Sequence, residues 1–365
     1  MSLSIGIVGL PNVGKSTLFN ALTEKAVPAE NYPFCTIDPS VGVVPVPDRR
    51  LESLADFSKS ESVVPVVVEF VDIAGLVRGA SKGEGLGNEF LQNIRDVDVI
   101  AHVVRIFDDD SLIHVEGSVY PARDIETINT ELLLSDIDTV QRRIAKTERD
   151  VKKGDKDAVA ESESLKKAIN LLSEGLRLYG SNLTDDERKR LKPLNLLTLK
   201  PMLYVLNKKA GAINLDEVRD GRIEDLEMQL DRENAPQVKI DAGIGSELQG
   251  IDPAEKESFR LELGAQDDGV DSLIKKGYEM LDLITYFTTG EKETRGWTIR
   301  RGSSAPEAGS AIHSDFQEKF IKAEVVEWQK LLEAGSKSEA RDKGLIRTEG
   351  KEYIVKDGDV IEFKI

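Results

Sequence analysis

The sequence predicts an α/β fold in which a mostly parallel β-sheet carries helices on both faces. Apolar runs alternate with helical patterns from residue 1 to about residue 130 and again after about residue 198. A stretch rich in Asp, Glu, Lys, Arg and Leu separates these parts, and a different α+β texture begins near residue 282. We therefore expect a first domain from residues 1–134 and 198–281, a helical insertion at 135–197 and a C-terminal domain at 282–365.

Short apolar runs of strand length mark the sheet of the first domain. The first run precedes a helical pattern at residues 16–22, and the later runs are separated by polar or helical segments. The expected strands are residues 3–8, 41–46, 64–71, 97–104, 202–207 and 237–240.

The insertion has the apolar spacing of helices. Ile137, Val140 and Ile144 recur at intervals of three and four residues. The sequence Lys-Gly-Asp at 153–155 predicts a break between two antiparallel helices. Two interpretations stay open: a solvated, charged helix pair without a specific role, or an arm that contacts a partner.

The C-terminal domain is expected to be a small α+β module. The segments TYFTT at 285–289 and GWTIR at 296–300 mark its beginning, and a helix is expected at 315–332. The sequence Lys-Asp-Gly-Asp at 356–359 lies between two apolar runs and predicts a hairpin or a wider chain reversal.

Composition bounds the class of protein. The 365 residues carry a formal net charge of −17, which repels nucleic acids and anionic membranes, so any RNA contact needs a local basic patch. The one cysteine, Cys35, excludes an internal disulfide and a Cys-rich zinc site and favours a reducing compartment. No signal peptide or membrane-spanning run is visible, so we expect a cytoplasmic protein that does not use a membrane.

A glycine-rich run, GLPNVGKS at residues 9–16, matches the phosphate-binding pattern G-x-x-x-x-G-K-[ST] between an expected strand and an expected helix. Glycines let backbone N–H groups turn toward a phosphate, and the helix N-terminus adds positive potential. Lys15 can reach the β- and γ-phosphates and assist catalysis, and the Ser16 hydroxyl can ligate Mg²⁺. The nucleotide-binding residues expected here are Asn12, Val13, Gly14, Lys15, Ser16 and Thr17.

Two further segments complete the expected magnesium and γ-phosphate site. An apolar run ends in the D-x-x-G sequence of Asp72 and Gly75. Asp72 can hold the Mg²⁺ shell through water, and the Gly75 N–H can sense the γ-phosphate. Thr36, between the two motifs, can complete the Mg²⁺ shell. We expect residues 30–40 and 75–90 to be switches that a γ-phosphate orders.

The residue after D-x-x-G departs from the usual hydrolytic machinery. Leu76 occupies the place where many GTPases carry a glutamine that positions water, and leucine cannot hydrogen-bond a water molecule. Hydrolysis is then either intrinsically slow or assisted by another group.

The base-recognition segment is LNKKA at residues 206–210. A guanine-specific protein would carry N-K-x-D here, but the last position is Ala210, which cannot accept a hydrogen bond from guanine. Asn207 and the Lys208 backbone can still frame a purine. Asp241 and Ala242, after the expected strand 237–240, are expected to line the base from the other side.

These motifs together resemble the YchF-type Obg-like ATPases, a branch of the translation-factor-related P-loop proteins. The likeness runs nearly from end to end and includes GIVGLPNVGKST at 6–17, NYPFCTI at 31–37, DIAGLV at 72–77, IHV at 113–115 and RGWTIR at 295–300. The resemblance implies a P-loop NTPase domain, a coiled-coil-like helical insertion and a C-terminal TGS domain of β-grasp shape. It also implies Mg²⁺-dependent hydrolysis of ATP in preference to GTP, and association with the ribosome, where we expect the large subunit.

The sequence departs from this family at the base site. The family usually carries N-x-x-E, so Ala210 leaves neither Asp nor Glu at this position, and the choice between ATP and GTP stays open. The segment 240–242 also departs from the small residues that are usual there.

Two residues carry further roles that the resemblance suggests. His114, in an expected loop after strand 97–104, can replace the missing glutamine by orienting or deprotonating water. An exposed loop histidine without a role is the alternative. Asn12 can help to coordinate a monovalent cation such as K⁺, or can simply stabilise the turn. His102, inside an apolar strand, is expected to be packed rather than catalytic.

Cations and an aromatic residue interleave in the C-terminal domain. Arg295, Trp297, Arg300 and Arg301 suit contact with RNA or a ribosomal protein. The alternative is a β-strand with a half-buried tryptophan and solvated arginines.

The sequence thus predicts a monomeric P-loop ATPase that acts as a switch on the ribosome, with RNA contacts through the TGS domain and the helical insertion. Two alternatives remain: a GTPase of the same fold, and a ribosome- or RNA-binding adaptor with vestigial hydrolysis. Leu76 favours the adaptor. The intact set of Lys15, Ser16, Thr36 and Asp72 favours a working switch.

Overall fold

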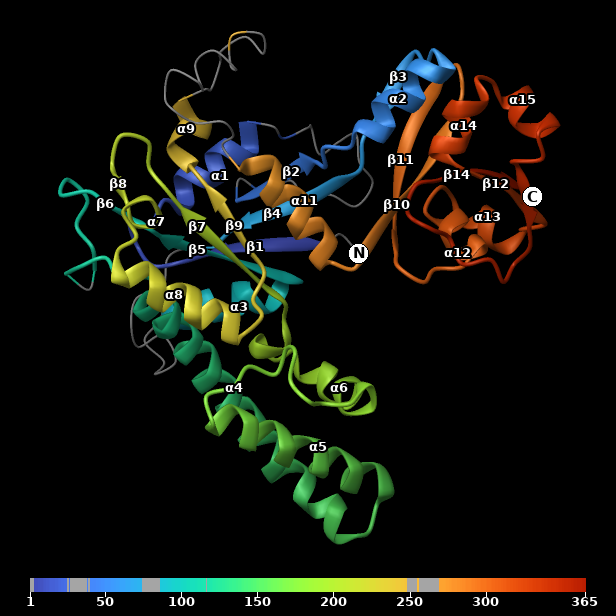
Figure 1. Ribbon diagram of the computed structural model, residues 1–365. Coiled ribbons are helices and arrows are strands. Elements are labelled where there is room, and N and C mark those ends of the chain that lie inside the picture. Colours follow the sequence, from blue (N-terminus) through green and yellow to red (C-terminus); the bar gives the residue numbers. More distant parts are fainter. Residues whose placement is uncertain are drawn as a thin grey trace. The chain divides into compact units, whose positions relative to one another are not determined.

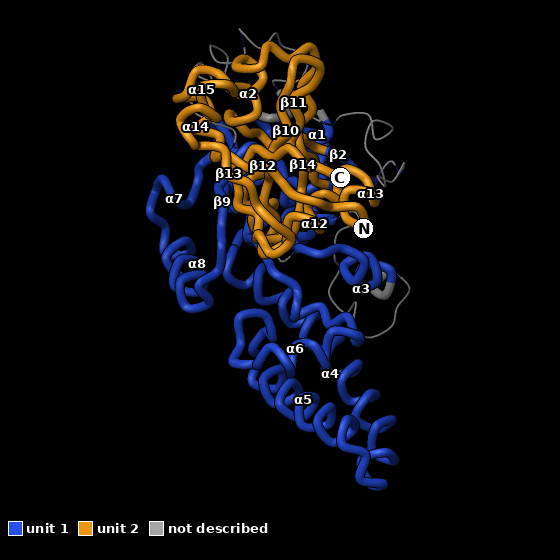
Figure 2. The backbone as a smooth tube through the Cα atoms, turned by 90° about the vertical axis from the view of Figure 1, so that its right-hand side faces the viewer, with its two compact units in different colours: residues 1–43, 69–273 blue, residues 44–68, 274–365 orange. Residues whose placement is uncertain are grey.

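The computed structural model describes residues 3–24, 26, 38, 40–73, 86–115, 117–247, 255 and 269–365 (Figure 1). The chain forms two compact units, which Figure 2 colours separately. One consists of residues 1–43 and 69–273, and the other of residues 44–68 and 274–365. None of the described helices has the length and apolar character needed to cross a membrane.

A six-stranded sheet forms the centre of the first unit. Its strands are β1 (Ser4–Val8), β2 (Val41–Pro45), β4 (Val67–Asp72), β5 (Val99–Arg105), β7 (Met202–Asn207) and β9 (Gln237–Ile240). They lie in the order β2-β4-β1-β5-β7-β9, and the pairs β4–β1, β1–β5, β5–β7 and β7–β9 are parallel. Every residue of β1, β5 and β7 is buried, as expected for parallel strands covered on both faces. The predicted α/β class is confirmed.

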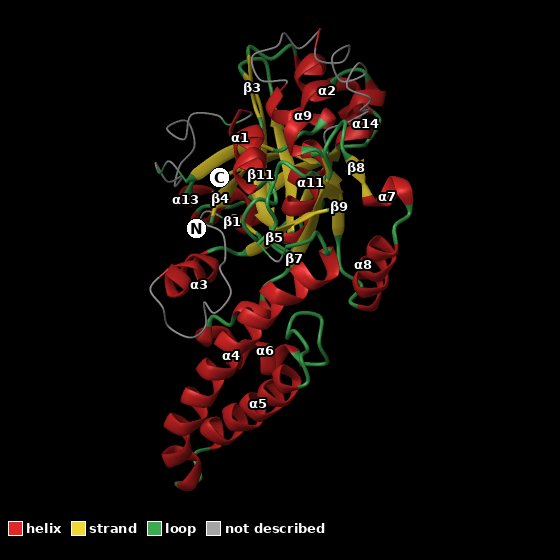
Figure 3. Cartoon of the chain, turned by 90° about the vertical axis from the view of Figure 1, so that its left-hand side faces the viewer, coloured by secondary structure: helices red, strands yellow, loops and turns green. Residues whose placement is uncertain are grey.

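Helices cover both faces of this sheet. The covering helices are α1 (Lys15–Glu24), α3 (Leu86–Asp96), α4 (Pro121–Lys152), α8 (Gly221–Arg232) and α9 (Ala242–Glu247). Figures 1 and 3 show α1 and α9 on one side and α3, α4 and α8 on the other. A short antiparallel ribbon of β6 (Phe107–Asp108) and β8 (Ile213–Asn214), followed by α7 (Leu215–Val218), lies beyond the ends of the strands.

The helical insertion grows directly out of the first unit. Helix α4 already begins at Pro121, earlier than the expected boundary at residue 135, because Pro121 starts a helix that continues without a break to Lys152. The chain reverses at residues 153–155, as predicted, and returns as α5 (Lys156–Ser173), α6 (Asp185–Leu191) and the 3₁₀ turns η3 (Lys192–Leu194) and η4 (Leu197–Leu199). A separate apolar core joins these helices: Val140, Leu165, Ala168, Leu172, Leu178, Leu183, Leu191 and Leu196.

A buried carboxylate fixes the middle of α4. Asp136 is fully buried and accepts hydrogen bonds from the amide of Leu197 at 3.0 Å and from the amide and hydroxyl of Thr198, each at 2.7 Å. Burial raises the pKa of Asp136, and these three donors oppose the rise. The helix is therefore anchored to the returning chain at its centre.

The second unit is a mixed sheet with helices on both faces. Its strands lie in the order β13-β12-β14-β10-β11-β3, where β10 pairs antiparallel with β11 and parallel with β14, and β12 pairs antiparallel with β14. The strands are β3 (Ser62–Val64), β10 (Leu283–Thr289), β11 (Glu293–Arg300), β12 (Lys322–Glu327), β13 (Arg347–Glu349) and β14 (Asp359–Lys364). The helices are α2 (Arg49–Ser58), α12 (Ala305–Ser310), α13 (Ser314–Glu318), α14 (Trp328–Ala334) and α15 (Lys337–Asp342), and α11 (Val270–Met280) precedes β10.

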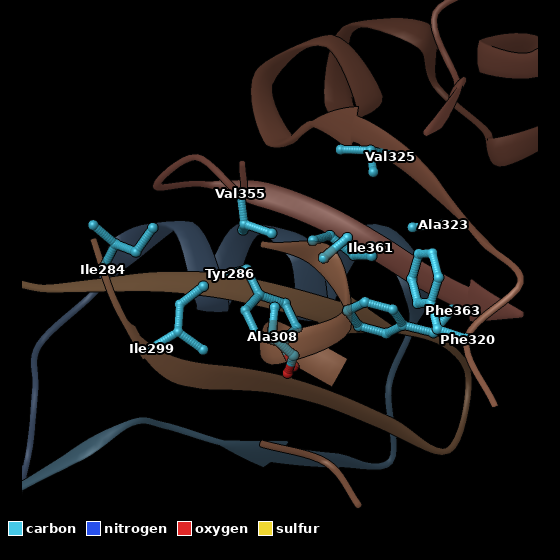
Figure 4. Close-up of a cluster of buried hydrophobic side chains, with 11 residues drawn as sticks. Ile284, Tyr286, Ile299, Ala308, Phe320, Ala323, Val325, Val355, Ile361 and Phe363 are labelled. Atoms are coloured by element: carbon cyan, nitrogen blue, oxygen red, sulfur yellow. The ribbon is translucent and has the colours of Figure 1, made fainter. Parts of the chain in front are cut away.

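Each face of this second sheet has its own apolar core. Figure 4 shows the core that includes Tyr286, Phe320 and Phe363. The opposite core contains Phe287 and Val326. Alternate residues of β10 therefore face different cores, which is the two-residue period of a strand buried on both sides.

Most of the segment 44–68, including α2 and β3, belongs with the second unit, although its two ends form part of β2 and β4 in the first sheet. This differs from the expected domain division. Leu51 and Leu54 of α2 pack in the same core as Phe287 and Val360, and β3 pairs in parallel with β11. Sequence position placed this segment in the first domain, but its apolar partners are more than 200 positions away in the sequence. The sequence gives no local signal for such a distant contact.

One local prediction for the C-terminal module needs correction, and another is narrowed. The expected helix at 315–332 is interrupted, because residues 322–327 pair along their whole length with β14. Ala323 and Val325 face one core and Val326 faces the other, as in a strand that is covered on both sides. The chain turns at 356–359, where Gly358 has φ +87, and β14 then pairs with β12 and β10. Of the two predicted alternatives, the wider reversal rather than the hairpin is therefore correct.

Candidate functional site

The phosphate side of the candidate site consists of residues 9–17 and Asp72. Helix α1 begins where the amide of Leu18 donates to the Gly14 carbonyl oxygen at 2.9 Å. Gly14 has φ +96, and a Cβ atom there would lie 2.3 Å from Nδ2 of Asn207. Asn12 also has a positive φ, +62, which asparagine tolerates better than most residues. The backbone geometry thus requires these residue types here.

A lysine and a carboxylate influence each other on this side. Lys15 is 8% exposed, and its Nζ donates to the Leu10 carbonyl oxygen at 2.8 Å. Asp72 ends β4 beside Ile7 of β1. Burial lowers the pKa of Lys15 and raises the pKa of Asp72, and the charge of each residue opposes the shift of the other. The two charges therefore stabilise each other.

The residues around this pair fit a divalent cation. Ser16 is exposed in the first turn of α1, and the half-buried Asp72 carboxylate accepts no hydrogen bond from another described residue. Hydroxyl and carboxylate oxygens are ligands that Mg²⁺ prefers. The described residues hold no group of three or more His, Cys, Asp or Glu side chains for a metal, so a cation here would also need oxygens from a bound ligand. Thr36, Gly75, Leu76 and Cys35 lie outside the described residues.

The base side of the candidate site consists of residues 206–210 and 240–244, which follow β7 and β9. Asn207 connects three segments: its Nδ2 donates to the Val13 carbonyl oxygen at 2.8 Å, and its Oδ1 accepts from the Ala242 amide at 3.1 Å. The amide of Lys208 donates to the Ile240 carbonyl oxygen at 2.8 Å. Asn207 thereby joins the phosphate loop to both loops of the base side.

A buried carboxylate lies next to position 210. Oδ2 of Asp241 accepts from the Ala210 amide at 2.6 Å, and Oδ1 accepts from the Ile244 amide at 3.1 Å. The Lys208 side chain pairs with Glu217 at 2.6 Å. Ala210 itself carries no carboxylate, but the Asp241 carboxylate of the neighbouring loop lies within hydrogen-bond distance of its backbone.

A buried arginine organises the loop that carries His114. Arg105 ends β5 and is 1% exposed. Its guanidinium donates to the carbonyl oxygens of Phe107, Asp109 and Leu112, at 3.0 Å, 3.1 Å and 3.1 Å. One side chain thus satisfies three carbonyl groups and defines the loop's conformation. The only sequence signal for this role was a charge at the end of an apolar strand.

His114 points toward α4. Its Nε2 lies 2.9 Å from Oδ2 of Asp124 in the first turn of that helix, and both side chains are buried. The carbonyl oxygen of the preceding Ile113 accepts from Nδ2 of Asn12 in the phosphate loop at 3.0 Å. His114 is therefore not an exposed loop histidine, and its loop touches the phosphate loop. Sequence reasoning missed Asp124, because an acid in the first turn of a helix is ordinarily a partner of the helix dipole.

The other two histidines have structural environments. His102 is buried in β5, with its ring centroid 5.5 Å from that of Tyr204. Burial, and then the charges of Arg177 and Lys15, lower the pKa of His102 to about 3, so the ring is neutral. This agrees with the expectation that His102 is packed. His313 caps α13 in the second unit.

The cationic segment of the second unit is partly structural. The Arg295 guanidinium lies 4.5 Å from the ring centroid of Trp297, whose Nε1 donates to Oγ1 of Thr288 at 2.9 Å. Trp297 is half-buried against the core shown in Figure 4, whereas Arg300 and Arg301 are exposed. Contact of these cations with RNA or a ribosomal protein stays a prediction.

Two family models match the chain. One, described as a 50S ribosome-binding GTPase, matches residues 4–144. The other, for the C-terminal domain of YchF GTPases and described as a protein of unknown function, matches residues 283–365.

Several proteins are similar over the full length. The ribosome-binding ATPase YchF of Bacillus subtilis is 49% identical over 368 residues, which cover 100% of this chain and 99% of the relative. The ribosome-binding ATPase YchF of Escherichia coli O157:H7 is 46% identical over 367 residues, with the same coverage. The solved structure of the Schizosaccharomyces pombe YchF GTPase matches with a TM-score of 0.87 at 35% identity and covers 100% of this chain and 98% of that chain.

Proposed function

The chain belongs to the YchF family, and from that premise we propose that it hydrolyses ATP and acts as a nucleotide-controlled switch on the ribosome. One observation carries the proposal. The charges of Lys15 and Asp72 interact where β1 and β4 end, and Ser16 follows Lys15 in the first turn of α1. In the same loop, a Cβ atom at Gly14 would clash with Asn207. This arrangement suits a nucleoside triphosphate with its cation.

The phosphate side would do most of the chemistry. Lys15 and the amides of residues 12–17 would bind the β- and γ-phosphates and stabilise the charge that develops on them. The oxygen of a water molecule would attack the γ-phosphorus, and the bond to the bridging oxygen would break with release of ADP. The Gly75 N–H is the proposed sensor of the γ-phosphate, and the ordering of residues 30–40 and 75–90 is the proposed switch.

Mg²⁺ is the proposed cofactor, with Ser16 and Thr36 as direct ligands and Asp72 acting through water. When bound, the cation neutralises phosphate charge. Asn12 is the proposed contributor to a K⁺ site. Its Nδ2 donates to Ile113, so its amide oxygen is the atom that would face a cation.

His114 is the proposed replacement for the water-positioning glutamine, whose usual place Leu76 occupies. Its loop is joined to the phosphate loop by the Asn12–Ile113 hydrogen bond. An imidazole can orient a water molecule or accept its proton. We expect His114→Ala to lower turnover and leave ATP affinity unchanged.

The base side supports a preference for adenine. Asn207, Lys208, Asp241 and Ala242 are the proposed base-binding residues. The Asp241 carboxylate can accept from the adenine amino group and repels the guanine 6-oxygen. The Ala242 amide, a donor that would suit that oxygen, is already bonded to Asn207.

Ribosome association is proposed to involve the large subunit. The C-terminal domain at residues 282–365, proposed to be a TGS domain of β-grasp shape, and the helical insertion at 135–197 are the proposed contact surfaces, with RNA among the partners. The exposed Arg300 and Arg301 supply local positive charge in a protein whose net charge is −17. We propose a monomer that acts in the cytoplasm, where ribosomes are found.

Calorimetric titration with ATP, GTP and their non-hydrolysable analogues, combined with single-turnover hydrolysis with and without ribosomes, tests this function. We expect tighter binding of ATP and a hydrolysis rate that ribosomes raise. Tighter binding of GTP would favour the GTPase alternative. Nucleotide binding without hydrolysis, even with ribosomes present, would favour the adaptor with vestigial hydrolysis.

A further inference from the structure

The loop around His114 has an inverted pattern of burial. Leu112, Ile113 and Val115 are 38%, 82% and 51% exposed, whereas His114 between them is 7% exposed. Burial of apolar side chains normally stabilises a fold, whereas an imidazole is usually at least partly solvated. A specific contact must therefore hold the imidazole inside.

Asp124 supplies that contact. The pair of Nε2 and Oδ2 at 2.9 Å joins side chains that are only 3% and 2% exposed. Burial raises the pKa of Asp124, and His114 and then Arg123 lower it again. A buried carboxylate is costly without a partner, so Asp124 and His114 each keep the other in place.

The rest of the loop is fixed close to the phosphate loop. The three hydrogen bonds from Arg105 define its course, and the Asn12–Ile113 bond joins it to the phosphate loop at 3.0 Å. The backbone next to His114 is thus already beside the phosphate side. For the imidazole to face a phosphate, the His114 side chain must rotate, but the loop as a whole does not have to move.

We propose that Asp124 is a positioning residue that holds His114 in an inward orientation, and that hydrolysis proceeds when this pair opens and the ring turns toward the phosphate side. The proposal rests on the proposed function, because it assumes that His114 acts on the attacking water. In the inward orientation, Nε2 is occupied by the carboxylate and cannot accept a proton from water. The opening of the pair then limits the rate of the chemical step.

The test is single-turnover ATP hydrolysis by the full-length protein carrying Asp124→Asn. We expect the rate to rise about tenfold, the effect of weakening one charge-assisted hydrogen bond, with the dissociation constant for ATP unchanged. Asp138→Asn is the matched control, because Asp138 is an exposed carboxylate on the same helix. In a His114→Ala background, Asp124→Asn should give no rise.

The outcomes separate this proposal from the function on which it rests. An unchanged or lower rate in Asp124→Asn, while His114→Ala still slows the wild-type protein, overturns the role of Asp124 alone. A lower rate would mean that Asp124 orients the imidazole productively. A rise that persists without His114 overturns it as well. Absence of ATP hydrolysis in the wild-type protein contradicts the proposed function instead.

A spectroscopic readout applies even if Asp124→Asn folds poorly. The chain has three histidines, so nitrogen-15 correlations of the His114 ring can be assigned by His102→Gln and His313→Gln. We expect the Nε2 signal of the wild-type protein to change when a non-hydrolysable ATP analogue and Mg²⁺ are added. An Nε2 signal that stays unchanged at saturating analogue means that the pair does not open, and overturns the proposal.

Discussion

The phosphate side and the base side of the site are built in different ways. The phosphate side comes from one contiguous segment, residues 9–17, plus Asp72, and its backbone conformation admits few alternatives at Gly14. The base side comes from two loops after β7 and β9, joined through Asn207 and Asp241. Position 210 carries no acid, and Asp241 of the other loop accepts a hydrogen bond from the Ala210 amide.

This difference explains which properties the sequence motifs determine. A contiguous loop brings its own geometry, so triphosphate binding follows from the motif alone. In a base site assembled from two loops, either loop can supply a given functional group. Base selectivity must therefore be derived from contacts such as that between Asp241 and Ala210.

The largest expected effect tests the phosphate side directly. Lys15→Ala should lower the single-turnover rate of ATP hydrolysis by about 10³-fold, because it removes the cation that stabilises the transferred phosphate. Lys192→Ala, which removes an exposed lysine, is the control. A rate within about threefold of the wild type would mean that the loop binds nucleotide without catalysis.

The next variant acts on the contact between Gly14 and Asn207, which connects the phosphate side with the base side. In Gly14→Ala the new Cβ atom would lie 2.3 Å from Nδ2 of Asn207, so Asn207 must move and loosen both loops. We expect calorimetry to show that ATP and GTP both bind about 10²-fold more weakly. The matched control is Gly211→Ala, which has a similar positive φ, +74, but nothing within 4 Å, and should leave affinity unchanged. Equal effects of the two substitutions would mean that the clash is irrelevant.

Lowering the pH should decrease the free energy of unfolding, because a buried histidine lies in the core next to the phosphate loop. His102 pairs in register with Val8, the last residue of β1, and its pKa is lowered to about 3. The unfolded chain binds a proton at this residue below about pH 6.5, and the folded chain does not, so stability is lost as the pH falls from 6.5 toward 3. Denaturant unfolding should show about 2 kcal/mol lost from this residue between pH 7 and pH 5.

His102→Leu should remove that share of the pH dependence. His313→Asn, which changes an exposed histidine and keeps a helix cap, should not. Identical slopes of stability against pH in the wild-type protein and His102→Leu would show that His102 is protonated without cost.

The smallest expected effect concerns the base side. Asp241→Asn should reduce the ratio of ATP to GTP affinity by about tenfold, because the amide removes a charge that favours the adenine amino group. Adding Ala210→Glu should restore the ratio by returning an acid to the other loop. Asp216→Asn, which changes a nearby carboxylate that pairs with Lys208, is the control. A ratio unchanged by Asp241→Asn would remove Asp241 from base selection.

The parts of the fold that the sequence predicted are those with local causes. The six strands of the first unit are apolar runs of strand length, and the break at 153–155 is a glycine turn with φ +78 at Gly154. The phosphate loop was recognisable for the same reason. Residues 322–327 were misassigned because a short strand between two short helices has no period long enough to identify it.

The unpredicted parts depend on distant contacts. Arg105 and Asp124 both bind the loop that carries His114: Arg105 binds its carbonyl groups, and Asp124 binds the histidine. The segment 44–68 joins the second unit because Leu54 packs with Phe287. No spacing along the chain records such pairs.

The anchoring of α4 at Asp136 has a mechanical consequence. At 1.5 Å per residue, Asp124 lies about 18 Å from this anchor on one side, and Lys152 lies about 24 Å from it on the other. The two arms of the helix are held differently. Between Asp124 and the anchor, Ile125, Ile128 and Leu132 are fully buried, whereas only Val140 and Thr147 are buried beyond it. A force on the tip of the hairpin should therefore bend the outer arm first, and the buried inner arm keeps the His114–Asp124 pair isolated from that movement.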